Sequence, residues 1–523
     1  MVEFHELTQY QSYLNDESNI VTNGNADRIY FPQNESEVQE IVKNANQSST
    51  PVTISGGGTG ISGGRVPQSG WLIATDKMNV IEGISELWTD PETKNEYHLL
   101  LKEIDSDTAV LTVPVSITVK AVQNYVREKG WFYPPDPTER TSYLGGNVST
   151  NASGARTFKY SATRKWIHGL HIVLPDGELI ELSRDQDNGK ISSEAIFLKT
   201  NHTVLEIPRP KYILPKVTKH VAGPVIDDSS HPLDLFIGSN GIFGFVTQVT
   251  LRLIRPPIQI YSIFTYCDSS EQAFDLIRAC QKQRREQSSP IPLSVEFFDE
   301  RATIILRDKE PRVNKGIKAV VMLEQDVYSE EELEKSLDFY NNLFTSLGIE
   351  DSDVALTYAE NEHHKFLRHW VAEYVIGLNR TFGQSLIVSD YSVPESNFKE
   401  FFDFLIATGE KYVSYLIQRK ELGEGNPGYT LFGHVGDCHP HLTLLPRDDE
   451  EAKYAMALLV EVVEKTVGLG GSIASEHGLG KKHFGDKIAF WYQYGDQGIE
   501  DVKKMKNVID PQNLLCPNNL IFM

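Results

Sequence analysis

A glycine-dense segment, Ser55–Gly64, constrains the fold of this chain more than any other feature of its sequence. Six of its ten residues are glycine, and it lies between two short apolar runs, Pro51–Ile54 and Trp71–Ala74, that are predicted to be strands. Closely spaced glycines let backbone N–H groups converge on an anion with no side chains in the way. The segment therefore predicts a phosphate cradle, with a merely flexible loop as the alternative.

The stretch Gly58–Gly63 also matches the G-x-G-x-x-G pattern of dinucleotide-binding folds, and Asp76 follows at a suitable distance. In those folds a helix begins within the glycines. Here Gly64, Pro67 and Gly70 oppose a helix. We therefore expect a cradle formed by a loop alone, and an NAD-dependent dehydrogenase is the least favoured class of enzyme.

Two further segments of small residues follow, Leu144–Arg156 and Gly238–Gly244, and each is predicted to lie beside a strand. Small residues at this density let a flat ring lie against the backbone. One such segment is weak evidence, but three in order predict one extended ligand that crosses several loops.

Local patterns predict several other elements of the first half. A helix is expected at 118–129 with Val119, Val122 and Val126 facing inward, and a hairpin at 171–182 turns at Pro175–Gly177. Residues 84–108 are expected to be a polar excursion within a hairpin, residues 183–232 an irregular surface loop region, and residues 236–254 a pair of strands. The second half alternates longer helical patterns with short strands, and its clearest helix is 449–467.

A group of histidines lies between two apolar runs of the second half. The segment Gly433–His441 contains His434, His439, His441 and Asp437, and is predicted to be a turn between strands. After the helix at 449–467 comes Gly470–Gly480, which a strand–helix–strand arrangement would bring beside the turn.

The second segment contains Glu476 and His477. Two imidazoles and one carboxylate that leave a coordination position open are the ligand set of a catalytic divalent metal. A solvated turn held by hydrogen bonds is the alternative, and these residues alone leave both open.

Segments 50–80, 133–181 and 234–254 resemble the PCMH-type FAD-binding domain of the vanillyl-alcohol-oxidase superfamily. The likeness is to its branch of D-lactate dehydrogenases, glycolate oxidases and D-2-hydroxyglutarate dehydrogenases. It implies that the first glycine segment holds the FAD pyrophosphate and that the other two segments line the binding site of the isoalloxazine and adenosine parts. The residues implied to bind FAD are Gly56, Gly57, Gly58, Thr59, Gly60, Gly63, Gly64, Pro135, Gly145, Gly146, Asn147, Ser149, Asn151, Gly154, Gly238, Gly241 and Val246. Relatives with covalent flavin often carry a histidine between the positions of Ile54 and Arg65, and this chain has none, so we expect a dissociable FAD.

The same branch carries a G-H-x-G-D-G-N-x-H segment and a later G-E-H-G-x-G segment, and this chain resembles both. The resemblance implies that His434, His441 and Glu476 bind a divalent metal, zinc or manganese, and that His477 is the general base. Cys438-His439 replaces the Gly-Asn of the first segment, which makes His439 an additional potential ligand.

Two cationic positions of the branch are missing from this chain. Ala372 stands where the branch often has the arginine of an R-E pair, and Val388 stands in place of the lysine of a K-Y-D-x-S-x-P segment. Arg368 or Arg380 are candidates to anchor a substrate carboxylate instead. The substrate and its stereochemistry therefore stay open.

The resemblance implies an α+β fold with two parts. Residues 1–255 would form a two-subdomain PCMH-type FAD-binding domain, and residues 256–523 an α+β substrate (cap) domain with an antiparallel sheet. Roughly the last 25 residues would pack back on the FAD domain. Residues 84–108 and 183–232 would be insertions.

The expected function is an FAD-dependent dehydrogenase that oxidises a small D-2-hydroxy acid to the 2-oxo acid by metal-assisted proton abstraction and hydride transfer. A metal-independent sugar or aldonolactone-type flavin oxidase, or a catalytically inactive relative of the same fold, is the alternative. The four cysteines form no C-x-x-C pair, so no iron–sulfur centre is expected. We therefore expect electrons to pass to an external quinone, flavoprotein or cytochrome.

The overall charge and hydropathy exclude several classes of partner. The net charge of −22 opposes nucleic-acid binding, which depends on Lys and Arg to neutralise phosphates. No apolar run is long enough to span a membrane, and the first residues lack the cationic start of a secretion signal. A cytoplasmic protein is expected, with attachment to the inner face of a membrane and a homodimer left open.

Overall fold

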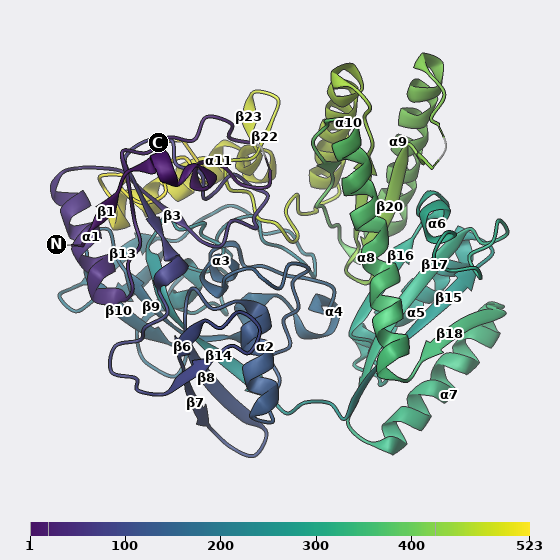
Figure 1. Cartoon of the computed structure of the whole chain (residues 1–523), viewed down its shortest axis with the longest axis horizontal. Coiled ribbons are helices and arrows are strands. Elements are labelled where there is room, and N and C mark those ends of the chain that lie inside the picture. The colour runs from purple at the N-terminus through teal and green to yellow at the C-terminus, as the bar shows by residue number, and fades with distance from the viewer. Residues whose placement is uncertain (1, 19, 424, 523) are drawn as a thin grey trace.

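The structure, a computed structural model, describes residues 2–18, 20–423 and 425–522. It has two bodies side by side (Figure 1). The first half of the chain, purple to teal, forms one body together with the yellow C-terminal residues. The green part of the chain covers the sheet of the other body with helices. The fold is α+β, as predicted.

The first sheet of the first body contains the strand that leads into the first glycine segment. Its order is β1 (Phe4–His5), β2 (Arg28–Tyr30), β4 (Trp71–Ala74) and β3 (Val52–Ser55). Strands β2, β4 and β3 run parallel, and helix α1 (Glu35–Gln47) connects β2 to β3. No helix lies between β3 and β4, whose intervening residues are all described, so the first glycine segment is a loop, as predicted.

The second sheet of the first body is antiparallel. Its order is β10 (Leu179–Ser183), β9 (Ile167–Val173), β14 (Phe245–Ile254), β8 (Thr108–Pro114) and β7 (Leu100–Glu103). The predicted hairpin at 171–182 is confirmed as β9–β10. The strand pair predicted at 236–254 is wrong, because β14 is its only strand in the described residues. Gly238, Asn240 and Gly241 have left-handed φ values of +79°, +53° and +77°, which turn the chain instead.

Helices of the first body place the second glycine segment. Helix α2 (Val119–Glu128) buries Val119, Val122 and Val126, as predicted. The second glycine segment begins as helix α3 (Leu144–Thr150), which packs against β14, and α4 (Thr157–Tyr160) follows it. The prediction that this segment lies beside a strand is confirmed by that packing, but its helical form was not foreseen.

The two expected insertions contain regular structure. Strands β5 (Leu87–Thr89) and β6 (Glu96–His98) pair within 84–108. Strands β11 (Gly189–Ile191), β12 (Ala195–Lys199) and β13 (Val204–Pro208) form an antiparallel sheet. The prediction of an irregular surface loop at 183–232 is therefore wrong for 189–208, where apolar residues of β12 and β13 reach the core.

The second body is built on one antiparallel sheet of seven strands. Their order is β18 (Asp351–Ala355), β15 (Gln259–Cys267), β17 (Ala319–Val327), β16 (Ser294–Phe298), β20 (Tyr429–His434), β21 (His439–Leu444) and β19 (Ile387–Val388). Every residue of the inner strand β17 is buried, which requires helices on both faces of the sheet.

Alternate residues of β17 face different helices. Val321 and Leu323 belong to a core shared with α5 (Ser270–Glu286) and α7 (Glu330–Leu347). Val320 and Met322 belong to a core shared with α6 (Glu300–Leu306) and α8 (Tyr358–Thr381). The remaining long helices of this body are α9 (Phe398–Arg419) and α10 (Asp449–Gly468), which contact strands β20, β21 and β19.

The chain then returns to the first body. Strands β22 (His483–Phe484) and β23 (Lys487–Ile488) precede helix α11 (Ala489–Ile509), which contacts β13. Beyond α11, the Val52 N–H donates to the Leu514 carbonyl at 2.8 Å and the Cys516 N–H donates to the Val52 carbonyl at 2.7 Å. The C-terminal residues therefore lie against β3, while the boundary at 255/256 stays a prediction. No helix in the described ranges has the length and apolar character needed to cross a membrane.

Candidate active site

The three glycine segments line one cavity. Gly58, Gly146 and Gly241, one from each segment, all lie on its wall. Its empty volume is about 930 Å³, including space open to solvent, which is within the usual size of small-molecule sites. The predicted cofactor residues on this wall are Gly56, Gly57, Gly58, Thr59, Gly60, Gly64, Gly145, Gly146, Asn147, Ser149, Gly241 and Val246.

Five predicted cofactor residues do not line the cavity: Gly63, Pro135, Asn151, Gly154 and Gly238. Several of them shape the adjoining backbone. A Cβ on Gly154 would lie 2.0 Å from the Asp136 carbonyl oxygen, and Asn151 has a left-handed φ of +52° at the end of α3. The Gly63 N–H donates to the carboxylate of Asp16 at 2.7 Å, which fixes the first segment.

Arg65 is a cavity residue that the sequence prediction missed. Its Nη1 atom lies 1.9 Å from the position that a Cβ on Gly58 would occupy, and its guanidinium lies over the ring of Tyr13. Its buried Nε has no hydrogen-bond partner among the residues described. A cationic group with an unused donor beside exposed backbone glycines fits the anionic pyrophosphate of FAD. The one indication of this role in the sequence is that Arg65 is the first basic residue after the glycine segment.

The adjacent glycines of α3 allow a test of whether the cavity holds FAD. A Cβ on Gly145 would lie 2.7 Å from Cβ of Val115, whereas a Cβ on Gly146 would meet no atom within 4 Å. We expect Gly146→Ala to leave the FAD-free fold as stable or up to about 1 kcal/mol more stable, because alanine favours a helix. The same change should weaken FAD binding about tenfold or more by occupying ligand space.

Gly145→Ala is the matched control and should lower the free energy of unfolding by about 1–3 kcal/mol through overpacking. Urea unfolding of the FAD-free protein and titration with FAD, followed by flavin fluorescence, measure the two effects. An unchanged dissociation constant for FAD in Gly146→Ala would remove this wall of the cavity from the cofactor site.

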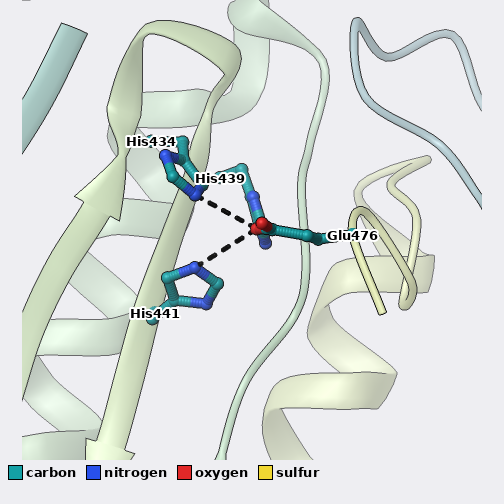
Figure 2. A group of neighbouring side chains, drawn as sticks. All are labelled: His434, His439, His441 and Glu476. Atoms are coloured by element: carbon teal, nitrogen blue, oxygen red, sulfur yellow. Dashed lines mark hydrogen bonds and ion pairs between the residues drawn. The ribbon is translucent and has the colours of Figure 1, made fainter. Parts of the chain in front are cut away.

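The histidines and Glu476 come together at one end of the seven-stranded sheet of the second body (Figure 2). His434 ends β20, His441 lies in β21, and the two strands pair as the predicted hairpin. The His434 Nε2 and His441 Nε2 atoms lie 3.1 Å and 3.8 Å from Glu476 Oε2. Glu476 lies on a loop after α10, and the strand predicted there is absent from the described residues, where only a single bridge joins Ser392 to Ser472.

The cluster is buried rather than solvated. His434, His439 and Glu476 are 5 %, 0 % and 7 % exposed, so the turn is not solvated, although hydrogen bonds do join His434 to Glu296 and Glu476. Ligand atoms of His434, His439, His441 and Glu476 all lie within 4.8 Å of one another. The buried Nδ1 of His439 has no hydrogen-bond partner in the part of the chain that the structure describes.

The protonation states of the cluster suit a divalent cation. Burial and the neighbouring His434 lower the pKa of His441 to about 4, and burial holds the pKa of His439 well below its usual value. Burial alone would raise the pKa of Glu476, but Lys219 and His434 outweigh it and hold that pKa well below its usual value. Burial alone would lower the pKa of His434, but Glu296 and Glu476 outweigh it and raise that pKa, so this ring must lose its proton when a metal binds. Neutral imidazoles and an ionised carboxylate are the forms that bind a metal.

Two carboxylates from other strands and loops support the cluster, and the sequence prediction missed both. Glu296 in β16 lies 2.7 Å from His434 Nδ1, so it orients the ring as outer carboxylates orient metal-binding histidines. Asp390 accepts the backbone N–H groups of Glu476 and His477 at 3.0 Å and 2.9 Å. Asp437 has a different role, because its carboxylate accepts a hydrogen bond from Arg284.

His477 has a second contact with Asp390. Its Nδ1 lies 3.2 Å from Asp390 Oδ2, and its side chain is 29 % exposed. Asp390 Oδ1 also lies 2.9 Å from His439 Nε2. The next residue, Gly478, lies against Thr150 and Asn240, both of which line the glycine cavity. His477 is therefore next to the glycine cavity and beside the histidine–glutamate cluster.

The two candidate substrate anchors are in different places. Arg368, on α8, points into the site with its Nε 3.5 Å from Glu296 Oε2. Arg380 lies in the last turn of α8 and is exposed, and no contact joins its side chain to the cluster within the described ranges. Lys219, which the prediction also missed, has its Nζ 3.4 Å from Glu476 Oε2.

Asp136, in the proline-rich stretch before α3, gives the fold a dependence on pH. Burial alone would raise its pKa, but Arg156 and Arg140 outweigh it and lower the pKa to about 2. Because the folded pKa is the lower one, its stabilisation is present above the unfolded pKa near 4 and is lost as the pH falls toward 2.

The free energy of unfolding should therefore fall by about 2 kcal/mol over that interval on account of Asp136 alone. Denaturant unfolding at a series of pH values measures the loss. Asp136→Asn should remove this part of the slope, and Asp308→Asn, an exposed aspartate, should leave it intact. An identical slope in the Asp136→Asn variant would contradict the assignment.

Comparison with known proteins places the chain in a family. Residues 26–183 match the family described as "FAD binding domain", and residues 261–520 match "FAD linked oxidases, C-terminal domain". The chain belongs to the FAD-linked oxidase family. It is an FAD-dependent oxidoreductase.

Individual relatives are similar along nearly the whole chain. Glycolate oxidase subunit GlcD of Bacillus subtilis is 25% identical, with 94% of this chain and 88% of the relative covered. D-lactate dehydrogenase of Archaeoglobus fulgidus is 25% identical over 94% and 91% of the two chains. D-2-hydroxyglutarate dehydrogenase of Stutzerimonas stutzeri is 25% identical over 94% and 90%. Among solved structures, alkyldihydroxyacetonephosphate synthase superposes with a TM-score of 0.60 at 14% identity, covering 94% of this chain and 77% of that one, which shows the shared fold alone.

Proposed function

We propose that this protein oxidises a small D-2-hydroxy acid to the corresponding 2-oxo acid. One observation carries the proposal: the cavity lined by three glycine segments adjoins a buried group of three imidazoles and a carboxylate, with His477 between them. The names of the relatives, which include a glycolate oxidase subunit and D-lactate and D-2-hydroxyglutarate dehydrogenases, agree with this substrate class.

The chain's own residues divide the work of the reaction. FAD bound in the glycine cavity would supply the acceptor for the hydride from C2 of the substrate. His477 accepts the proton of the C2 hydroxyl at Nε2, while the Asp390 carboxylate lies 3.2 Å from its Nδ1 on the other side of the ring. The C2 hydride and the hydroxyl proton leave together as the carbonyl forms, so atoms and electrons balance.

The histidine–glutamate group would hold a divalent cation, zinc or manganese. His434, His441 and Glu476 are the proposed ligands and His439 is a further potential ligand. A divalent cation at such a site lowers the pKa of an oxygen that it binds, which favours release of the hydroxyl proton. Glu296 holds His434 in its binding orientation.

The charges around the cluster agree with a cation and an anionic substrate. With the imidazoles deprotonated, as metal binding requires, the carboxylates of Glu296, Glu476 and Asp390 exceed the cations of Lys219 and Arg368 by one negative charge. That sign disfavours an anionic substrate. A divalent cation would reverse the sign and leave one positive charge, which a monocarboxylate neutralises.

Anaerobic mixing of the FAD-loaded protein with a panel of D- and L-2-hydroxy acids tests the proposal. Loss of oxidised-flavin absorbance with at least one D-isomer is the expected result. A chelator should prevent that loss, whereas a sugar or aldonolactone-type oxidase would be insensitive to it. Reduction by aldonolactones alone, or by none of these compounds, would overturn the proposal. An external quinone, flavoprotein or cytochrome is the proposed electron acceptor, and rapid reoxidation by oxygen alone would contradict that part.

A further inference from the structure

Lys219 comes from a part of the chain that lies between the two family matches. Residues 184–260 lie outside both matched ranges. Most of this stretch was expected to be a surface loop, yet Lys219 is 0 % exposed and is among the largest fully buried side chains of the described protein. It enters the histidine–glutamate cluster from the side of the first body.

The backbone on both sides of Lys219 is held in place. The Lys219 carbonyl accepts a hydrogen bond from the Ser392 hydroxyl at 2.8 Å, and the Val221 N–H donates to the Ala474 carbonyl at 2.8 Å. His220, between them, lies 2.7 Å from the Ser472 hydroxyl and 2.8 Å from the Tyr494 hydroxyl. The segment that contains Lys219 is therefore fixed in place by hydrogen bonds to neighbouring parts of the chain.

The ammonium of Lys219 has donors that no protein atom uses. Among the described residues its one partner is Glu476 Oε2 at 3.4 Å, an oxygen that His434 Nε2 also contacts at 3.1 Å. An ammonium has three N–H donors, so two have no acceptor here. Burying a charged group without hydrogen-bond partners is costly, so this position implies an acceptor that arrives with a ligand.

The other cation of the site, Arg368, faces more negative charge than Lys219 does. Arg368 lies 3.5 Å from Glu296, and Glu296, Glu324 and Asp136 all act on its guanidinium. Glu476 is the one carboxylate that Lys219 contacts among the described residues, through the same oxygen that His434 and His441 face, so Lys219 is the less compensated cation beside the cluster. A compact ammonium suits a single carboxylate in a confined space.

We propose that Lys219 binds the carboxylate of the substrate and so selects 2-hydroxy acids over neutral alcohols. This inference rests on the proposed function for the nature of the substrate. It assigns the recognition of the acid group to a residue outside both family matches.

The test uses the FAD-loaded protein and compares Lys219→Met and Lys219→Arg with Lys216→Met, an exposed lysine of the same segment. Two probes are used: oxalate, whose binding is followed by the change in the flavin spectrum, and whichever hydroxy acid reduces the wild type. Lys219→Met should weaken oxalate binding and raise KM by about 10- to 100-fold, as expected for a lost hydrogen bond to a charged group. Lys219→Arg should recover most of this, and Lys216→Met should match the wild type.

Metal and FAD contents of each variant are measured alongside. Unchanged content with weaker oxalate binding supports the proposal. Unchanged oxalate affinity overturns it. So does a loss of metal large enough to explain the whole fall in oxalate affinity, because Lys219 would then act by holding the metal ligand Glu476. If Lys219→Met does not fold, Lys219→Gln is judged by the same criteria. Oxalate binds whether or not a hydroxy acid reduces the flavin, so a wild type that binds oxalate but is reduced by no hydroxy acid contradicts the proposed function and not the role of Lys219.

Discussion

Replacing His477 with alanine should slow reduction of the flavin by substrate about 10²–10⁴-fold, the range typical of a positioned general base. His477 is the partly exposed imidazole at the junction of the glycine cavity and the cluster, and Asp390 Oδ2 lies 3.2 Å from its Nδ1. Rapid anaerobic mixing measures the rate. FAD should remain bound, because His477 does not line the glycine cavity.

His483→Ala is the matched control for this result. His483 lies six residues further along the chain, in β22, and is exposed. Among the hydrogen bonds of the described residues, its Nδ1 contacts only the Lys481 carbonyl. The control should keep the wild-type rate. Reduction of His477→Ala at the wild-type rate would remove this residue from the role of base and leave the proton without an acceptor in the proposed reaction.

The second large effect concerns the metal ligands. His434→Ala should abolish metal occupancy, with a loss of affinity greater than the about 10–100-fold that follows removal of an outer carboxylate. Reduction of the flavin should fall with it. Elemental analysis of the purified protein and activity after chelation and readdition of zinc or manganese measure the effect.

Two other variants show which groups coordinate. Glu296→Gln removes the carboxylate at His434 Nδ1, so it should weaken metal binding by only about 10–100-fold. His439→Asn should retain metal if three ligands suffice and lose much of its affinity if His439 is a fourth ligand. Full metal occupancy in His434→Ala would break the assignment of the cluster.

Those parts of the fold that depend on local pattern were predictable from the sequence. The loop at Ser55–Gly64, the hairpin at 171–182 and the turn between β20 and β21 all follow from glycine, proline and apolar spacing. Such features depend on neighbours in the chain, so a short window contains the relevant information. The helical form of α3 was missed because glycine is a poor helix former, and packing of α3 on β14 overrides that preference.

The missed residues act over long separations in the sequence. Glu296 lies 138 residues before His434, and Lys219 lies 257 residues before Glu476. No local periodicity links such pairs. Lys219 was also missed because it lies in a polar stretch, and polar stretches are expected to be exposed. In the structure, hydrogen bonds to the loops at Ser392 and Ala474 hold this stretch inside the protein. The sequence did give an indication of Asp390, because it lies two residues after Val388 in the segment that resembles K-Y-D-x-S-x-P. Its contact with His477 could be seen only in the folded chain.

A crystal structure of the FAD-loaded protein, with metal located by anomalous scattering, tests the central claim most directly. The expected result is a flavin that runs along Gly58, Gly146 and Gly241 with its ring toward His477, and an ion bound by His434, His441 and Glu476. A flavin bound outside the glycine cavity, or an ion bound away from these three side chains, would contradict the proposed site.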